Sequence, residues 1–181
     1  MELSLLVFLP VVAAAAILLL PRSMEHHARW VALAASLASL ALSLQMFFSF
    51  DLNAPGYQFV ERREWVDLGA FDLQYFLGVD GLSMPLVLLT TCLTLASVLV
   101  SFSITLRPRA YFACLLVLAS SVIGVFAALD FLLFFLFWEL ELFPMYLLIS
   151  IWGSGRKEYS AMMFVLYTIA GSASMLVGIL V

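Results

Sequence analysis

Residues 131–152 read FLLFFLFWELELFPMYLLISIW, a run that is long enough to cross a bilayer as a helix. The hydrocarbon core of a membrane is about 30 Å thick, and a helix crosses it in roughly 20 predominantly apolar residues. Two glutamates, Glu139 and Glu141, interrupt the run close to its middle. A charged side chain at that depth costs on the order of 3 kcal/mol. The stretch therefore predicts a membrane-spanning helix whose carboxylates face protein or water, not lipid.

The composition of the whole chain is that of a membrane protein. Its 181 residues are 65% hydrophobic and only 11% charged, and its mean hydropathy is +1.14, well outside the range of a soluble globular domain. The predicted fold class is an all-α polytopic membrane protein. Its six predicted spans are 3–20, 30–50, 84–106, 111–129, 131–152 and 159–181.

Several other classes of site find no support in the sequence. The net charge of −4 and the scattered basic residues do not indicate nucleic-acid binding. Cys92 and Cys114 fall inside predicted spans without a CxxC or CxxH spacing, so we interpret them as small apolar residues. His26 and His27 have no third ligand nearby in sequence, so no metal site is predicted. The chain also has no Gly-rich phosphate fingerprint and no thiolate cluster, so we expect it to bind neither NADH, flavin nor iron–sulfur centres.

The basic residues predict how the chain is oriented in the membrane. Six of the eight lie in the loops after the first, third and fifth spans, which the positive-inside rule places in the cytoplasm, so the N-terminus lies outside. Arg62 and Arg63 lie on the opposite side, where the acidic residues of their own loop outnumber them. Glu2 precedes the first span and arginines follow it, the reverse of a secretory signal, so cleavage is not expected. The basic residues of these three cytoplasmic loops are Arg22, Arg29, Arg107, Arg109, Arg156 and Lys157.

Residues 51–83 are the one sizeable loop between predicted spans. Within it, YQFVERREWVDLGAFDLQYFLGVDG mixes aromatic and β-branched residues with turn signals at Pro55-Gly56 and Asp80-Gly81. This pattern predicts a short hairpin packed at the membrane surface. The predicted organisation is two helices in 1–50, an extracytoplasmic loop in 51–83, and four helices in 84–181.

The two intramembrane acids project about 200° apart on a helix, so they do not form a paired acid/base site. A buried glutamate whose cationic partner can move or change charge is a switchable proton-binding group. Alternatively, each acid bonds a serine or a backbone group on a neighbouring helix and fixes packing. We favour the functional interpretation for Glu139 and leave Glu141 balanced between the two. No lysine or arginine lies inside a predicted span, so a cationic partner must come from elsewhere.

Three polar or helix-breaking features accompany the acids. Pro144 lacks an N–H, so it leaves the carbonyl of Leu140 without its helical partner and bends the span, which gives water a place to order. Tyr146 is a weaker candidate for a secondary proton relay, because a membrane tyrosine more often packs at a boundary. Small residues at four-residue spacing predict close helix packing in two spans: Ala35, Ser39 and Ser43, and Ala170, Ser174 and Gly178.

A family resemblance follows from longer motifs. FFLFWELELFPMYLLISIWG and EYSAMMFVLYTIAGS resemble the fifth and sixth helices of antiporter-like subunit M, the chain-4 type, of proton-pumping NADH:quinone oxidoreductase (complex I) and its photosynthetic relatives. YFLGVDGLSMPLVLLT resembles the start of that family's third helix. The resemblance implies that Glu139 is the proton-translocating glutamate, working with a lysine on the seventh helix. Glu141 matches a position that is acidic in only part of the family.

The same resemblance implies the surroundings of the chain. The family fold has fourteen helices, of which this would be the first part, in a bacterial plasma membrane or a thylakoid. NADH or another donor, FMN, iron–sulfur clusters and quinone would belong to partner subunits. The implied partners are the antiporter-like L and N types, lipid, and a segment or chain that carries the lysine and the remaining helices.

Two departures from the family leave alternatives open. Where the family usually reads ATKF, residues 161–164 read AMMF, so a common lysine is missing. The chain also ends before the lysine-bearing helix, as expected of a fragment of a longer product, a split subunit, or a truncated non-conducting scaffold. A subunit of a multisubunit cation/proton antiporter is the alternative transport function.

Overall fold

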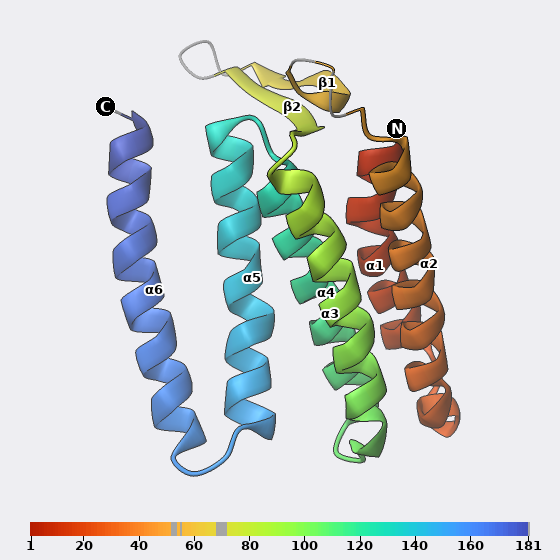
Figure 1. Ribbon diagram of the computed structural model, residues 1–181. Coiled ribbons are helices and arrows are strands. Elements are labelled where there is room, and N and C mark those ends of the chain that lie inside the picture. Colours follow the sequence, from red (N-terminus) through yellow and green to blue (C-terminus); the bar gives the residue numbers. More distant parts are fainter. Residues whose placement is uncertain (52–53, 55, 68–71, 181) are drawn as a thin grey trace.

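The computed structural model describes residues 1–51, 54, 56–67 and 72–180, which form a bundle of long helices with a two-stranded hairpin across one end (Figure 1). Within these residues, six helices are long and apolar enough to cross a membrane, which confirms the six predicted spans. They are α1 (Glu2–Leu19), α2 (Ala28–Ser49), α3 (Ser83–Val100), α4 (Pro108–Ala127), α5 (Phe131–Trp152) and α6 (Lys157–Leu180).

Helix boundaries follow from proline and aspartate. The largest difference from the predicted bounds is at α3, which ends at Val100 and not at Leu106. Pro108 opens α4, and proline disfavours the helical conformation in the residue before it; accordingly, Arg107 is left-handed at φ 46. At the start of α5, an oxygen of Asp130 accepts a hydrogen bond from the backbone N–H of Leu133 at 2.9 Å, an N-cap that fixes where the span begins.

Helix α4 is the centre of the bundle, and it packs against α1, α2, α3 and α5. Of the membrane-spanning part of α4, 56% is buried within the chain, against 6% for α6. Helix α6 packs on α5 and leaves its other sides open among the described residues. The helices around α4 are therefore well packed within the chain, whereas the side of the bundle at α6 is exposed; we call this exposed side the open side.

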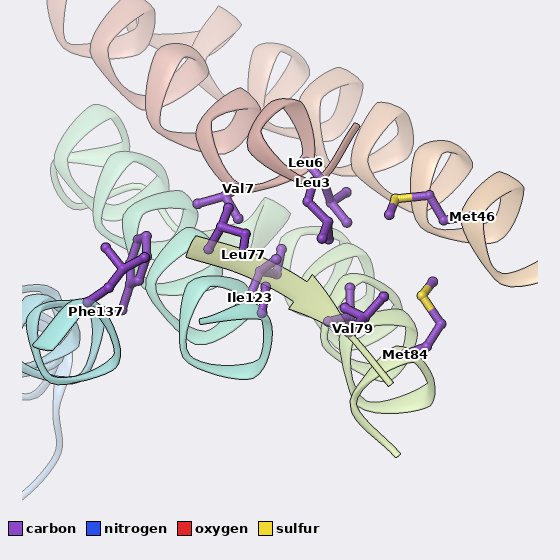
Figure 2. Packing of buried hydrophobic residues seen from close by; sticks show 12 residues of the cluster. Leu3, Leu6, Val7, Met46, Leu77, Val79, Met84, Ile123 and Phe137 are labelled. Carbon is purple, nitrogen blue, oxygen red and sulfur yellow. The ribbon is translucent and has the colours of Figure 1, made fainter. Parts of the chain in front are cut away.

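The hairpin consists of β1 (Gln58–Asp67) and β2 (Asp72–Val79), paired antiparallel. Figure 2 shows Leu77 and Val79 of β2 among side chains of the helix ends, including Leu3 and Ile123, where all four are buried. This packing confirms the predicted hairpin and its position at the end of the bundle. Of its predicted turn signals, Asp80-Gly81 does precede α3, whereas Pro55 lies outside the described residues.

The joins α1–α2, α3–α4 and α5–α6 lie at the opposite end of the bundle from the hairpin (Figure 1). The first of them contains the short 3-10 helix η1 (Arg22–His27), and η2 (Ser101–Ser103) follows α3 in the second. These joins carry the basic residues from which the orientation was predicted. The structure therefore collects them at one end, as the positive-inside rule requires.

The two small-residue stripes behave differently. Ala35, Ser39 and Ser43 are all buried on α2, and the hydroxyl of Ser43 lies 2.7 Å from that of Thr91 on α3, so close packing is confirmed there. The stripe on α6, formed by Ala170, Ser174 and Gly178, is exposed in the described part of the chain. Its predicted packing partner is not among the described residues.

Candidate proton-binding site

Helix α5 is continuous through Pro144 and places both intramembrane acids near mid-span. Glu139 and Glu141 are the ninth and eleventh residues after the cap at Asp130. Pro144 is buried and has no N–H, so the carbonyl of Leu140 loses its usual helical donor next to the two acids. The described residues thus place two carboxylates and one under-satisfied carbonyl within about one turn of a transmembrane helix.

Glu139 is the intramembrane acid with an orphaned atom. Its side chain is half-buried, and its Oε1 is buried without a hydrogen-bond partner among the described residues. An unsatisfied buried polar group costs about 1–3 kcal/mol, and more when it is charged. A carboxyl group left in this condition needs a proton, a water or a cation from outside the described residues.

The positions of neighbouring side chains define which side of α5 Glu139 occupies. Phe137 packs on α4, where a Cβ at Gly124 would collide with its ring. At about 100° per residue, Glu139 lies roughly 200° from Phe137 and about 40° from Phe143, which is 67% exposed. Glu139 therefore points away from the packed core around α4 and towards the edge of the open side of the bundle.

Glu141 and Tyr146 sit differently. Glu141 lies about 40° from Phe137, on the flank that faces α4, and it is half-buried. Tyr146 is 41% exposed. No hydrogen bond joins either residue to Glu139 in the described part of the chain, so a connected relay would need water or further residues.

Cations within the described residues are far from mid-span in sequence and in the fold. The lysine and arginines of the helices fall in their first turns, at Arg29, Arg109 and Lys157. The ion pairs found among the described residues are Met1 with Glu61 and Arg109 with Glu25. No described His, Cys, Asp or Glu residues form a group of three that could hold a metal ion. The ring centroids of His26 and His27 lie 3.8 Å apart at the bundle end, with the ring planes tilted by 43°.

A second carboxylate site, around Glu61 of β1, was not found from the sequence. Its Oε1 accepts hydrogen bonds from the backbone N–H groups of Leu3 at 3.0 Å and Ser4 at 3.3 Å, and lies 2.8 Å from the amine of Met1. The Ser4 hydroxyl donates to its Oε2 and lies 2.7 Å from the Tyr75 hydroxyl. Ser4 has one proton to donate, so Tyr75 is the donor in that second bond.

These contacts set the acidity of both groups. Burial raises the pKa of Glu61, but the amine and the donors of Ser4 outweigh it and hold that pKa below its usual value. Burial raises the pKa of Tyr75. Glu61 is therefore an ionised cap on the positive N-terminal end of α1. The sequence signal for it was weak, because 57 residues separate Glu61 from Ser4.

A six-helix bundle with a hairpin across one end and a carboxyl group orphaned at mid-span defines a polytopic membrane protein with a candidate proton-binding site. Solved structures share this fold: the Mrp complex from Dietzia sp. DQ12-45-1b (TM-score 0.79, 22% identity, covering 98% of this chain and 19% of that chain) and the membrane-bound sulfane sulfur reductase, an archaeal respiratory membrane complex (TM-score 0.78, 20% identity, covering 98% and 27%).

Sequence comparison narrows the class. Residues 128–181 match the family described as NADH:quinone oxidoreductase/Mrp antiporter, TM. Over 171 residues the chain is 43% identical to NAD(P)H-quinone oxidoreductase chain 4-1 of Synechocystis sp., covering 94% of this chain and 32% of that relative. Over nearly its whole length the chain is therefore similar to chain-4 proteins of this family, as the stretch FFLFWELELFPMYLLISIWG indicated, and it spans about a third of the length of the curated relatives it matches.

Proposed function

We propose that this chain is the six-helix part of a chain-4-type membrane-arm subunit of an NAD(P)H-quinone oxidoreductase, and that it contributes to redox-coupled proton translocation. The observation that carries the proposal is the orphaned Oε1 of Glu139, buried at mid-span without a partner in the described residues. Intramembrane acids are costly and mark ion or proton pathways. Glu139 is the proton-binding residue; Glu141 and Tyr146 are secondary relay groups, and Pro144 supplies the local distortion.

The partner of Glu139 comes from outside this chain or from its further helices. The curated relative is about three times as long as the aligned part, and α6 presents its small-residue stripe unpacked. Small residues let helix backbones approach closely. Further helices pack on α6 and bring a lysine within reach of Glu139.

Proton transfer then follows from ordinary electrostatics. A cation close to Glu139 stabilises its ionised form, whereas removal of the cation leaves a desolvated carboxylate that binds a proton. A conformational change driven by redox events elsewhere alternates these two states. Moving one charge against 100 mV costs about 2.3 kcal/mol.

Redox chemistry belongs to partner subunits in this proposal. The residues of the chain do not suit NADH, FMN, an iron–sulfur cluster or a quinone: Cys92 and Cys114 lie on different helices, and no Gly-rich phosphate loop is present in the sequence. The membrane partners are the antiporter-like L and N types. No electron-transfer step is assigned to this chain.

The test is Glu139→Gln in the full-length subunit, assembled in its complex in native membrane vesicles. Glutamine keeps the size of the side chain and cannot exchange a proton, so we expect donor-driven vesicle acidification to be abolished. Glu141→Gln and Tyr146→Phe should reduce it less. Glu158→Gln, at an exposed position in the first turn of α6, is the matched control and should leave it unchanged. Full proton translocation in an assembled Glu139→Gln complex would show that Glu139 is not the proton-binding residue.

The second candidate is a subunit of a multisubunit cation/proton antiporter, which the shared fold with the Mrp complex favours. The same vesicles discriminate between the two. Proton movement on addition of Na⁺ or K⁺, without an electron donor, would support the antiporter. Proton movement only on addition of donor and quinone would support the oxidoreductase, and neither response in a correctly assembled complex would indicate a non-conducting scaffold.

A further inference from the structure

A groove of about 970 Å³ opens on the face of the bundle between α1 and α5. Both helices pack against α4, which lies between them. The walls of the groove are apolar side chains that remain exposed: Leu5 at 53% and Phe8 at 45% on α1, and Leu136 at 46% and Leu140 at 43% on α5. These residues line a slot that runs along the helices at membrane depth.

The hairpin closes one end of this groove with polar groups. Arg63 of β1 and Tyr75 of β2 are direct partners across the two strands, and both line the groove with Ser4. The Tyr75 ring stacks on Phe8 at a centroid distance of 6.5 Å. The groove is therefore amphipathic: a cationic group stands at its hairpin end and hydrocarbon lines its length.

Arg63 is available for a ligand. Neighbouring strand residues point to opposite faces, and Arg62 accordingly points away from the groove, where it donates to Gln74 at 2.7 Å and lies over the Phe76 ring. The carboxylate of Glu61, which shares the Arg63 face, is engaged by Met1 and Ser4. Among the described residues no carboxylate forms an ion pair with Arg63.

We propose that this groove binds one anionic phospholipid, with an acyl chain along α1 and α5 and the phosphate at Arg63. The hairpin stands at the ends of the membrane-spanning helices (Figure 1), the level at which lipid headgroups lie. Guanidinium groups bind phosphate oxygens in pairs, and apolar surface at this depth gains from contact with a hydrocarbon chain. A protein helix would fill the slot but would leave Arg63 without an anion. This site is separate from Glu139 and does not depend on its role.

Native mass spectrometry of the detergent-solubilised protein measures the binding. Phosphatidylglycerol is titrated against phosphatidylcholine with the same acyl chains. We expect one phosphatidylglycerol per chain to persist, and Arg63→Gln to weaken it by about tenfold, the value of one charge-assisted hydrogen bond, while phosphatidylcholine binding is unchanged. Arg62→Gln, one residue away on the other face, should not alter it. Equal losses in Arg62→Gln and Arg63→Gln, or no preference for phosphatidylglycerol, would overturn the proposal.

A second experiment identifies the occupant in the membrane. A photoreactive benzoylphenylalanine replaces Leu136 in the groove, with Leu93 as the control, an apolar position of α3 that is 57% exposed and does not line the groove. A phosphatidylglycerol adduct at position 136 whose yield falls in the Arg63→Gln variant would support the proposal. Adducts to a protein segment at position 136, or equal phospholipid adducts at both positions, would refute it.

Discussion

Glu61 and Glu139 are both carboxylates removed from bulk water, and the chain treats them in opposite ways. Glu61 is surrounded by donors: two backbone N–H groups, the Ser4 hydroxyl and an amine. Glu139 has a buried oxygen with no donor in the described residues. The first arrangement ties the hairpin to α1 and fixes one charge state, whereas the second leaves the charge state open to whatever approaches. An acid whose oxygens all have hydrogen-bond donors stabilises the fold, whereas an acid with an oxygen that lacks a donor can bind and release a proton.

Glu61→Ala should break the satisfied site and have the largest effect on stability. It removes a charged acceptor from the N-terminal end of α1, and with it the hydrogen bonds from Leu3 and Ser4 to β1. Hydrogen bonds to charged groups contribute about 1.5–3 kcal/mol, so we expect a loss of about 2 kcal/mol in the free energy of unfolding. Equilibrium unfolding of the detergent-solubilised chain measures it. A change below about 0.5 kcal/mol would mean that the cap does not stabilise the fold.

Acid titration should have a smaller effect through the same group. The pKa of Glu61 is lowered from its ordinary value of 4.5, so its stabilising contribution is complete above that value and is lost as the pH falls through the lower folded pKa. Asp80, whose pKa is also lowered, chiefly by the backbone N–H of Ser83, acts in the same direction. The difference in melting temperature between wild type and Glu61→Gln therefore isolates Glu61, and it should shrink between pH 6 and pH 3. A constant difference would contradict this.

Glu139→Gln should have the smallest effect on stability, which sharpens the contrast with Glu61. No described donor loses a partner, so we expect a change of less than about 0.5 kcal/mol in the free energy of unfolding, comparable to a neutral substitution. Unfolding under the conditions used for Glu61→Ala measures it. A loss as large as that of Glu61→Ala would show that Glu139 is a structural residue of this chain.

The sequence predicts the helices well because hydrocarbon imposes one simple requirement, a long apolar run with its backbone bonded internally. The same requirement makes Glu139 conspicuous, since a carboxylate in such a run is rare. The sequence did not single out Glu61, because acidic residues are common in loops. Its role depends on the hairpin, which brings its carboxylate next to Ser4. The end of α3 was misplaced because residues 101–106 are apolar enough to continue the span, whereas in the structure α3 ends at Val100 and the short 3-10 helix η2 follows it.

The open side of α5 and α6 also shows where sequence patterns stop. The stripe on α2 and the stripe on α6 look alike in sequence, yet only the first is buried among the described residues. Four-residue spacing indicates that a helix can pack closely, and it does not identify the partner. The role of Glu139 also depends on a partner that the sequence pattern does not identify, because the groups near a carboxyl group determine whether it is charged.

The central position of α4 has a consequence for biosynthesis. Helix α1 packs mainly on α4, and the Ser120 hydroxyl donates to the carbonyl of Val7 at 2.6 Å across that contact. The start of α4 follows the end of α1 by 89 residues, from Leu19 to Pro108, and ribosomes add about 5–20 residues per second. Helix α1 therefore waits for roughly 4–18 s beside the translocon before its main partner emerges. A chaperone or an insertase would have that interval in which to bind it.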